Sequence, residues 1–324
     1  MFEILNFDNI SEEYQDLIFK ENKQTIFSTK LFLSYHLDKF NTEFLIYKKN
    51  NKELLLLPFV RDNDSLSSHP GASYGGFVEL KNIKDSEFEK IFNELNVFIK
   101  NNNINEVNIR YSPDIFLSKN NFDFNDYIKS KSVLNYEQEE TYIELSGRDF
   151  ENLNKTGFRK GHVSDISKFK NTINFSIKKL EKENEVSSYY SLLENNTSKY
   201  GVKPTHSKDD LYKLINLLPN HIEIFGLFSD SGLLISGITI FVLNQKTVAA
   251  FYSNFNHDLG NQARGGLKYL YWELLKKYKH EGYKFFTFGV DVKPGEPENK
   301  NLRYFKDGFG SNQDIRSNYT LTIS

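Results

Sequence analysis

Two stretches of the sequence carry residue types that bind phosphate groups. Residues 262–267 (Gln-Ala-Arg-Gly-Gly-Leu) stand at the start of a predicted helix, where backbone N–H groups made accessible by glycine can hold a diphosphate. Residues 154–163 contain Arg159 and Lys160 among other basic side chains, which can grip the phosphates of a nucleotide sugar, a polyprenyl diphosphate or a tRNA. The competing interpretations are a glycine turn for the first stretch and a solvated helix face for the second.

Four side chains near predicted strand ends and loops could move a proton: Asp291, Tyr252, Glu296 and His206. A carboxylate or a histidine can accept a proton from an attacking amine, and a tyrosine can return one to a leaving group. Asp291 follows a predicted strand, where loop residues commonly do chemistry. A turn-forming role for Asp291 and a packing role in the sheet for Tyr252 are the alternatives.

Composition excludes several other kinds of chemistry. The chain of 324 residues has no cysteine, so disulfides, zinc–thiolate sites and thiol nucleophiles are excluded, and its seven histidines are scattered without metal-ligand spacing. No Walker loop, serine elbow or dinucleotide fingerprint is present. A formal net charge of −2 gives no reason to expect DNA as a partner. We therefore expect no metal and no DNA.

The elements that would position these residues follow the same order in the two halves of the chain. In the first half, the pattern predicts a β-hairpin over residues 44–60 and a glycine-rich segment over 69–78 that leads into a strand. An amphipathic helix over 86–101 and a strand over 106–111 follow. In the second half, it predicts a hairpin over 221–243, a strand over 248–255, an amphipathic helix over 265–280 and a closing strand over 284–288.

This order is typical of an α/β (α+β) fold in which each half forms a mixed β-sheet flanked by helices. A repeat of this length favours a duplicated domain, with one domain over residues 1–146 and the other over 147–324; two unrelated α/β domains are the alternative. The segment between the halves predicts a helix from Asp149, as N-cap, towards Phe169, although Gly157 and Gly161 oppose it. A strand over 172–180 and helices over 183–199 and 208–218 follow.

Three segments together resemble the Fem family of double-GNAT acyl- and aminoacyl-transferases. They are the basic run over 154–163, the helix and strand over 265–289 that end in Phe-Gly, and the run Phe305-Lys306-Asp-Gly-Phe-Gly310. The run His69-Pro-Gly-Ala-Ser-Tyr74-Gly-Gly is similar to the first-domain glycine strand of family members from glycan loci. The resemblance covers about residues 40 to 312 and implies two fused GNAT-like domains, with the donor site in the second.

The resemblance also assigns roles to residues. It implies that Lys306 faces the active site, where its cation can stabilise the oxyanion formed when an amine attacks a thioester or ester. With the candidates named above, the predicted catalytic residues are Lys306, Asp291, Tyr252 and His206. Gln262, Arg264, Gly265 and Gly266 resemble the pyrophosphate loop that binds acyl-CoA, although Leu267 departs from that pattern. The substrate-binding residues would be Arg159, Lys160, Tyr74 and Phe305.

The leading hypothesis is an acyltransferase that moves an acyl group from acyl-CoA, as co-substrate, to the amino group of a sugar nucleotide or cell-surface glycan precursor. The alternatives are an aminoacyl-tRNA-dependent transferase acting on a peptidoglycan precursor, with tRNA as a partner, and a non-catalytic GNAT-like binding module. The N-terminus lacks the apolar core of a signal peptide, and no apolar run could span a membrane. We expect a cytoplasmic protein, for which peripheral membrane contact stays open.

Overall fold

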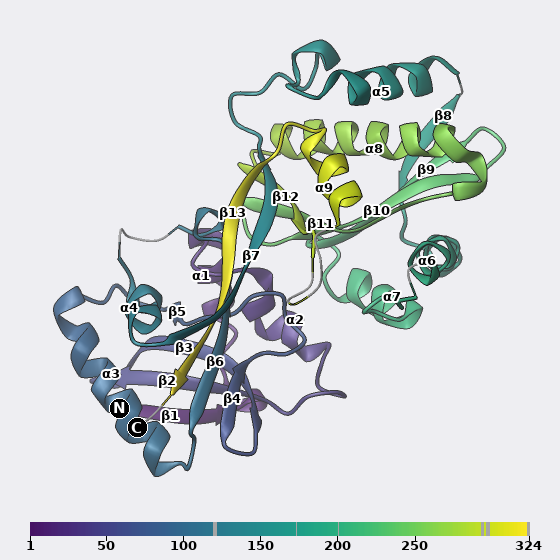
Figure 1. The fold of residues 1–324 in the computed structure, drawn as a ribbon. Coiled ribbons are helices and arrows are strands. Elements are labelled where there is room, and N and C mark those ends of the chain that lie inside the picture. Colours follow the sequence, from purple (N-terminus) through teal and green to yellow (C-terminus); the bar gives the residue numbers. More distant parts are fainter. Residues whose placement is uncertain (119–121, 173, 200, 293–294, 296–298, 323–324) are drawn as a thin grey trace. The chain divides into compact units, whose positions relative to one another are not determined.

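The computed structural model describes residues 1–118, 122–172, 174–199, 201–292, 295 and 299–322, which form two compact units (Figure 1). Unit 1 comprises Met1–Glu139 and Asp314–Ser324, and unit 2 comprises Glu140–Gln313. The chain enters unit 2 within strand β7 (Val133–Glu144) and returns within strand β13 (Asn312–Thr322). The sequence placed residues 314–324 in the second domain, whereas the structure groups them with unit 1, because β13 pairs antiparallel with β6 (Glu106–Tyr111).

Unit 1 is a mixed sheet with helices on both faces. Its remaining strands are β1 (Phe2–Asn6), β2 (Thr42–Lys49), β3 (Lys52–Asp62), β4 (Ser65–Ser68) and β5 (Val78–Glu79). Its helices are α1 (Tyr14–Glu21), α2 (Lys30–Ser34), α3 (Asp85–Asn101) and α4 (Phe124–Ser130), with short 3-10 turns at Phe7–Asn9, Ile26–Ser28 and Asp114–Phe116. The strand order is β1-β2-β3-β4-β6-β13, and β5 adds to β3.

The hairpin predicted over residues 44–60 and the helix over 86–101 are confirmed as β2–β3 and α3. Apolar side chains at helical spacing on α3 (Phe88, Ile91, Leu95 and Ile99) are buried against the sheet. The glycine-rich segment over 69–78, predicted to lead into a strand, is mostly a loop that ends in the two-residue strand β5. The strand that follows the hairpin is β4, which ends just before this segment.

Unit 2 also combines a mixed sheet with helices on both faces. Its helices are α5 (Lys160–Thr172), α6 (Glu183–Ser198), α7 (Lys208–Leu217), α8 (Gly260–His280) and α9 (Lys300–Asp307), with 3-10 turns at Leu153–Lys155 and His257–Leu259. Its strands are β8 (Phe175–Lys179), β9 (Ile222–Ser229), β10 (Leu234–Val242), β11 (Thr247–Phe255) and β12 (Phe285–Val290). The order is β7-β12-β11-β10-β9-β8.

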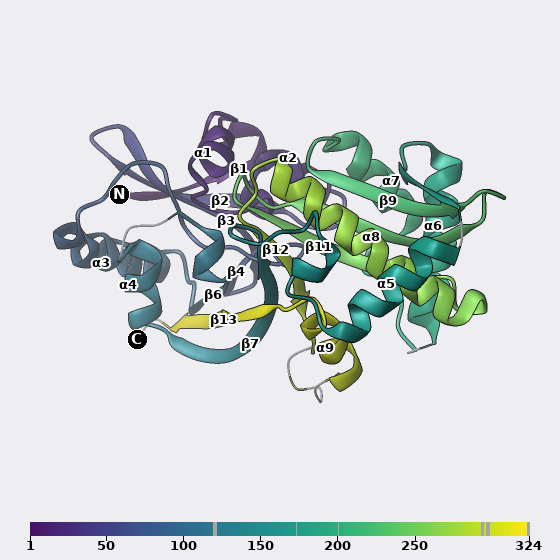
Figure 2. The same ribbon diagram turned by 90° about the horizontal axis from the view of Figure 1, so that it is seen from above.

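Helix α8 lies on one face of the unit 2 sheet and α5 packs over it, while α6 and α7 cover the other face (Figures 1 and 2). The apolar stripe of α8 (Leu267, Leu270, Leu274, Leu275 and Tyr278) belongs to one buried core with strands β9 to β12. The two units share the order hairpin, strand, helix, strand, and in each the two strands around the helix are parallel: β4 with β6, and β11 with β12.

The start predicted for the helix after Asp149 is wrong. Helix α5 begins at Lys160, because Gly157 adopts a left-handed conformation with φ of +80° that interrupts a helix. The Asp149 carboxylate caps a turn instead, accepting the backbone N–H groups of Glu151 at 3.1 Å and Asn152 at 3.3 Å. The predicted helices over 183–199 and 208–218 are confirmed as α6 and α7.

Candidate functional site

The strands β11 and β12 of unit 2 separate after a short parallel contact. They pair only from Thr247 to Ala249 and from Phe285 to Thr287, although β11 runs on to Phe255 and β12 to Val290. The far end of β11 leads through a 3-10 turn into α8, and the far end of β12 leads to Asp291. Beyond these residues β11 stays paired with β10 and β12 with β7, but the two strands no longer pair with each other.

Lys306 and Asp291 form a buried ion pair behind the end of β12. The Lys306 Nζ is 2.5 Å from Asp291 Oδ1 and donates to the backbone carbonyls of Gly289 and Val290, each at 2.9 Å. Only 3% of Lys306 is exposed. Burial lowers the pKa of Lys306, and the Asp291 carboxylate opposes that shift. The ammonium thus directs its three donors at the end of β12, which favours a structural role for Lys306, and its catalytic role stays a prediction.

The network extends to residues that the sequence interpretation missed. Arg303 on α9 reaches Asp291 Oδ2 at 3.2 Å, and the fully buried Glu140 on β7 accepts a hydrogen bond from Thr287 Oγ1 at 2.5 Å. Two carboxylates and two cations therefore share this interior. Glu140 was overlooked because it stands in the run Glu-Gln-Glu-Glu, which looks like the solvated side of a strand. Glu296, another proton-transfer candidate, lies outside the described residues.

His206 and Tyr252 are brought together as a pair, although they are far apart in sequence. The His206 Nδ1 lies 2.9 Å from the Tyr252 hydroxyl oxygen, which also accepts the backbone N–H of His206 at 3.2 Å. His206 is buried against the rings of Phe241 and Phe251. Burial raises the pKa of Tyr252, and its hydrogen bonds act in the opposite direction. Tyr252 lies on the part of β11 that does not pair with β12, and His206 reaches it from the loop that precedes α7.

The glycines predicted as a phosphate loop are inside helix α8. A Cβ on Gly265 would lie 3.1 Å from the Asp165 carbonyl oxygen on α5, and one on Gly266 would lie 3.0 Å from Ile235, Leu227 and Phe169. Both are buried, so their location at an accessible helix start is a wrong prediction: they let α5 approach α8 closely. The helix starts earlier, at Gly260, without a side-chain cap, and Gln262 and Arg264 are exposed on its first turns.

The basic candidates lie at the start of α5. The Arg159 guanidinium stacks 4.0 Å from the ring of Tyr304 on α9 and is half-buried, whereas Lys160 is exposed. Close by, the buried His162 ring lies within 2.6 Å of a Cβ placed on Gly308, and its Nε2 is 2.9 Å from the Phe305 carbonyl oxygen. Burial lowers the pKa of His162 to about 4. This contact holds the segment of the Phe305-Lys306 run against α5.

The remaining two predicted substrate contacts lie in packing positions. Phe305 is partly buried in the unit 2 core, with ring centroids 5.8 Å from Tyr271 and 5.4 Å from Phe309. Tyr74 is buried in unit 1 with its ring 5.7 Å from that of Phe27. Both rings therefore pack against other aromatic rings, and their part in substrate binding stays a prediction.

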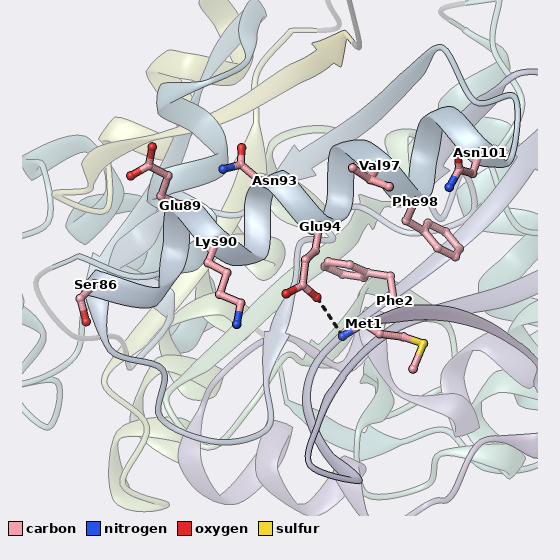
Figure 3. A pocket seen from close by; sticks show the side chains of 10 residues that line it. All are labelled: Met1, Phe2, Ser86, Glu89, Lys90, Asn93, Glu94, Val97, Phe98 and Asn101. Atoms are coloured by element: carbon pink, nitrogen blue, oxygen red, sulfur yellow. Dashed lines mark ion pairs between the residues drawn. The ribbon is translucent and has the colours of Figure 1, made fainter.

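A separate groove of about 700 Å³ runs along the outer face of α3 in unit 1, and Figure 3 shows its lining. Glu89, Lys90, Asn93 and Val97 come from the helix, and the Met1 amino group pairs with Glu94 at 3.0 Å. None of the predicted site residues lines it. Across the described residues, no group of three or more His, Cys, Asp or Glu could hold a metal ion, and no helix in this part of the chain could cross a membrane.

Comparisons with known proteins identify the fold. No family model and no curated protein matches the sequence. Among solved structures, FemX superposes with a TM-score of 0.69, covering 99% of this chain and 97% of that chain at 11% identity. A tandem GNAT protein from the clavulanic acid biosynthesis pathway gives 0.53 over 100% and 99% at 8% identity, and L-PGS from Bacillus licheniformis gives 0.54 over 90% of each at 15% identity. The chain has the Fem-like, tandem-GNAT fold, as predicted.

Proposed function

We propose that this chain is an acyltransferase that moves an acyl group from acyl-CoA to the amino group of a sugar nucleotide or cell-surface glycan precursor. The observation that carries the proposal is the separation of β11 from β12. Tyr252, paired with His206, lies on the part of β11 that has left β12, and the start of α8, which has no side-chain cap, follows that strand. The FemX-like fold supports a transferase of the acyl or aminoacyl class. We also propose that each unit is one GNAT-like domain.

In this proposal the first turn of α8 holds the diphosphate of the donor. Backbone N–H groups at a helix start are unpaired inside the helix, and the helix dipole adds positive potential there. Gln262 and Arg264 are exposed on the same turns, and the first turn carries no acidic residue. The buried glycines take no part in binding; their role is to seat α8 on α5.

The reaction joins the acceptor nitrogen to the acyl carbon and breaks the carbon–sulfur bond. The amine must lose a proton and the thiolate must gain one. The Tyr252 hydroxyl can give its proton to the departing sulfur, and the proton that the amine loses can return to the Tyr252 oxygen through His206, whose Nδ1 lies 2.9 Å away. Lys306 and Asp291 do not touch the substrate in this proposal. They hold the end of β12, the strand that faces β11 across the site.

The test is isothermal titration of the full chain with acetyl-CoA and with free CoA, comparing Gln262→Glu with Gln245→Glu. Both changes add one exposed carboxylate to unit 2, but Gln245 lies in the turn before β11, at the opposite end of that strand. We expect saturable binding that Gln262→Glu weakens about tenfold, equivalent to ~1.4 kcal/mol, while Gln245→Glu leaves it unchanged. Absence of binding to folded protein would refute acyl-CoA as donor.

The exposed Lys160 and the half-buried Arg159 favour a second candidate, an aminoacyl-tRNA-dependent transferase that acts on a peptidoglycan precursor. Phosphate contacts by lysine and arginine make nucleic-acid affinity fall steeply with salt. If CoA does not bind, a salt-dependent affinity for aminoacyl-tRNA that Lys160→Gln weakens would support this candidate. No binding of either donor would leave a non-catalytic binding module.

A further inference from the structure

Helix α8 places one tyrosine across the gap that opens between β11 and β12. The ring centroid of Tyr271 lies 5.1 Å from that of Phe288, the first residue of β12 beyond the part that pairs with β11. The Tyr271 hydroxyl forms a hydrogen bond with Ser253, which lies on the part of β11 that has left β12. Tyr271 therefore contacts both strands at the place where they no longer pair with each other.

The exposed fractions show which side of the gap Tyr271 closes. Ser253 is exposed, whereas only 2% of Tyr271 and 6% of Phe288 are exposed. Ser253 stands opposite Ile238 of β10, which belongs to the core that α8 covers, so the Ser253 side chain lies on the α8 face of the sheet. The gap is thus open at Ser253 and closed behind it, on the α8 side, by the Tyr271 ring.

The Tyr271 ring is itself packed against other aromatic rings. The fully buried Phe309 lies 5.2 Å from it and Phe305 lies 5.8 Å from it, both between ring centroids. Phe288 and Phe309 stack on each other at 5.4 Å. Rings packed in this way have little room to move, so a group in the gap could displace Tyr271 only by disrupting the core.

The gap ends where the parallel strands begin to pair, and buried polar contacts surround that end on the face opposite α8. Ala249 and Thr287 form the last pair of the ladder. Thr287 is fully buried, and its hydroxyl lies 2.5 Å from Glu140 Oε1 and 3.1 Å from the Thr141 carbonyl oxygen. A hydrocarbon chain that passed this point would have to break these contacts, which costs free energy.

We propose that Tyr271 limits the acyl group of the donor to a short chain, such as acetyl or propionyl, and excludes longer chains such as octanoyl. The inference rests on the proposed function, in which the donor runs from the start of α8 along β11 to a thioester beside Tyr252. The acyl group beyond the sulfur then points towards the closed end of the gap. A short group fits there, whereas a longer chain meets the Tyr271 ring and the buried contacts of Thr287.

The experiment measures the Kd of the full chain for free CoA, acetyl-CoA, butanoyl-CoA and octanoyl-CoA by isothermal titration. A site with room for hydrocarbon would bind octanoyl-CoA more tightly than acetyl-CoA, because each buried methylene adds affinity. We expect the reverse order, with octanoyl-CoA about tenfold weaker than acetyl-CoA and free CoA within about threefold of acetyl-CoA.

The variant Tyr271→Leu removes the ring that closes the gap and keeps an apolar side chain in the core. It should bring the Kd for octanoyl-CoA to within about threefold of that for acetyl-CoA and leave the Kd for free CoA unchanged. The matched control is Tyr269→Leu, because Tyr269 is buried on the same helix but packs against Phe175 of β8, at the far edge of the sheet. This control should keep the preference of the parent.

Octanoyl-CoA that binds the parent as tightly as acetyl-CoA would overturn the length limit and leave the donor site in place. Weak octanoyl-CoA binding that persists in folded Tyr271→Leu would overturn the role of Tyr271. If neither free CoA nor any acyl-CoA binds the folded parent, the proposed function fails and this inference fails with it. The length series on the parent needs no variant, so the length limit can be refuted even if Tyr271→Leu does not fold.

Discussion

Replacing Lys306 by methionine separates a structural role from a catalytic one. Methionine has nearly the same length but no charge, so it keeps the packing of α9 and removes the bonds to Gly289, Val290 and Asp291. The Asp291 carboxylate would then stay buried with Arg303 as its remaining cation. Removing one partner of a buried ion pair costs about 3–5 kcal/mol, so we expect Lys306→Met to lower the free energy of unfolding by that amount.

The measurement is urea unfolding followed by circular dichroism, with Lys300→Met as the matched control. Lys300 is exposed at the start of the same helix, so its replacement should change stability by less than about 0.5 kcal/mol. The double variant Lys306→Met/Asp291→Asn should recover part of the loss, because the amide leaves no unpaired charge behind. In a double-mutant cycle we expect a coupling free energy of about 1–3 kcal/mol.

The opposite result would refute the structural interpretation of Lys306. If Lys306→Met unfolds at the urea concentration of the parent and shows no coupling to Asp291, the ammonium does not hold the end of β12. An unchanged stability together with a large loss of transfer activity would instead return Lys306 to the oxyanion role that the resemblance implied. A partial loss of both stability and transfer activity would agree with the structural role, because distortion of the β12 end also displaces the site.

Three further changes test other parts of the structure. Tyr252→Phe should lower kcat about 10²-fold through loss of the proton donor, while the free energy of unfolding changes by no more than ~1 kcal/mol. A kcat equal to that of the parent would exclude Tyr252 as the general acid. Gly266→Ala should lower the free energy of unfolding in urea by about 1–3 kcal/mol, because the new Cβ would lie 3.0 Å from Ile235, Leu227 and Phe169. A gain in stability would show that the helix propensity of alanine outweighs this crowding. Burial holds the pKa of His69 at about 3, below its unfolded value of about 6.5, so His69 alone should lower the free energy of unfolding by ~1.4 kcal/mol per pH unit as pH drops from 6.5 to about 3. His162, whose pKa is about 4, adds a slope of the same sign between pH 6.5 and about pH 4. His69→Asn should therefore make the measured slope shallower by ~1.4 kcal/mol per pH unit, and an unchanged slope would contradict the buried neutral ring of His69.

The elements that local patterns define could be predicted from the sequence. The hairpins β2–β3 and β9–β10 and the helices α3 and α8 have apolar spacings that only one secondary structure satisfies. Strand β4 could not be found in this way, because four residues rich in serine carry too little pattern to differ from a loop. Its place in the sheet depends on pairing with β3 and β6, which are distant contacts that a local pattern does not encode.

The candidate site was predicted in part, and the failures have a common cause. The sequence identified His206 and Tyr252, and the structure brings them to hydrogen-bonding distance. The run Gln262 to Leu267 was misplaced because glycine serves both accessible loops and close helix packing, and only the neighbouring α5 decides which. Glu140 was missed because burial of a carboxylate depends on the partners that the fold supplies, and its neighbours in sequence are charged.

A comparison of equivalent helices argues that the two units differ in what they can bind. Helix α3 in unit 1 and helix α8 in unit 2 each connect a pair of parallel strands, so each start is a possible diphosphate site. The first turn of α3 carries Asp85 and Glu87, whose carboxylates occupy the positive end of the helix and repel a diphosphate, whereas the first turn of α8 carries no acid. The duplicated plan therefore leaves one helix start open to an anionic donor.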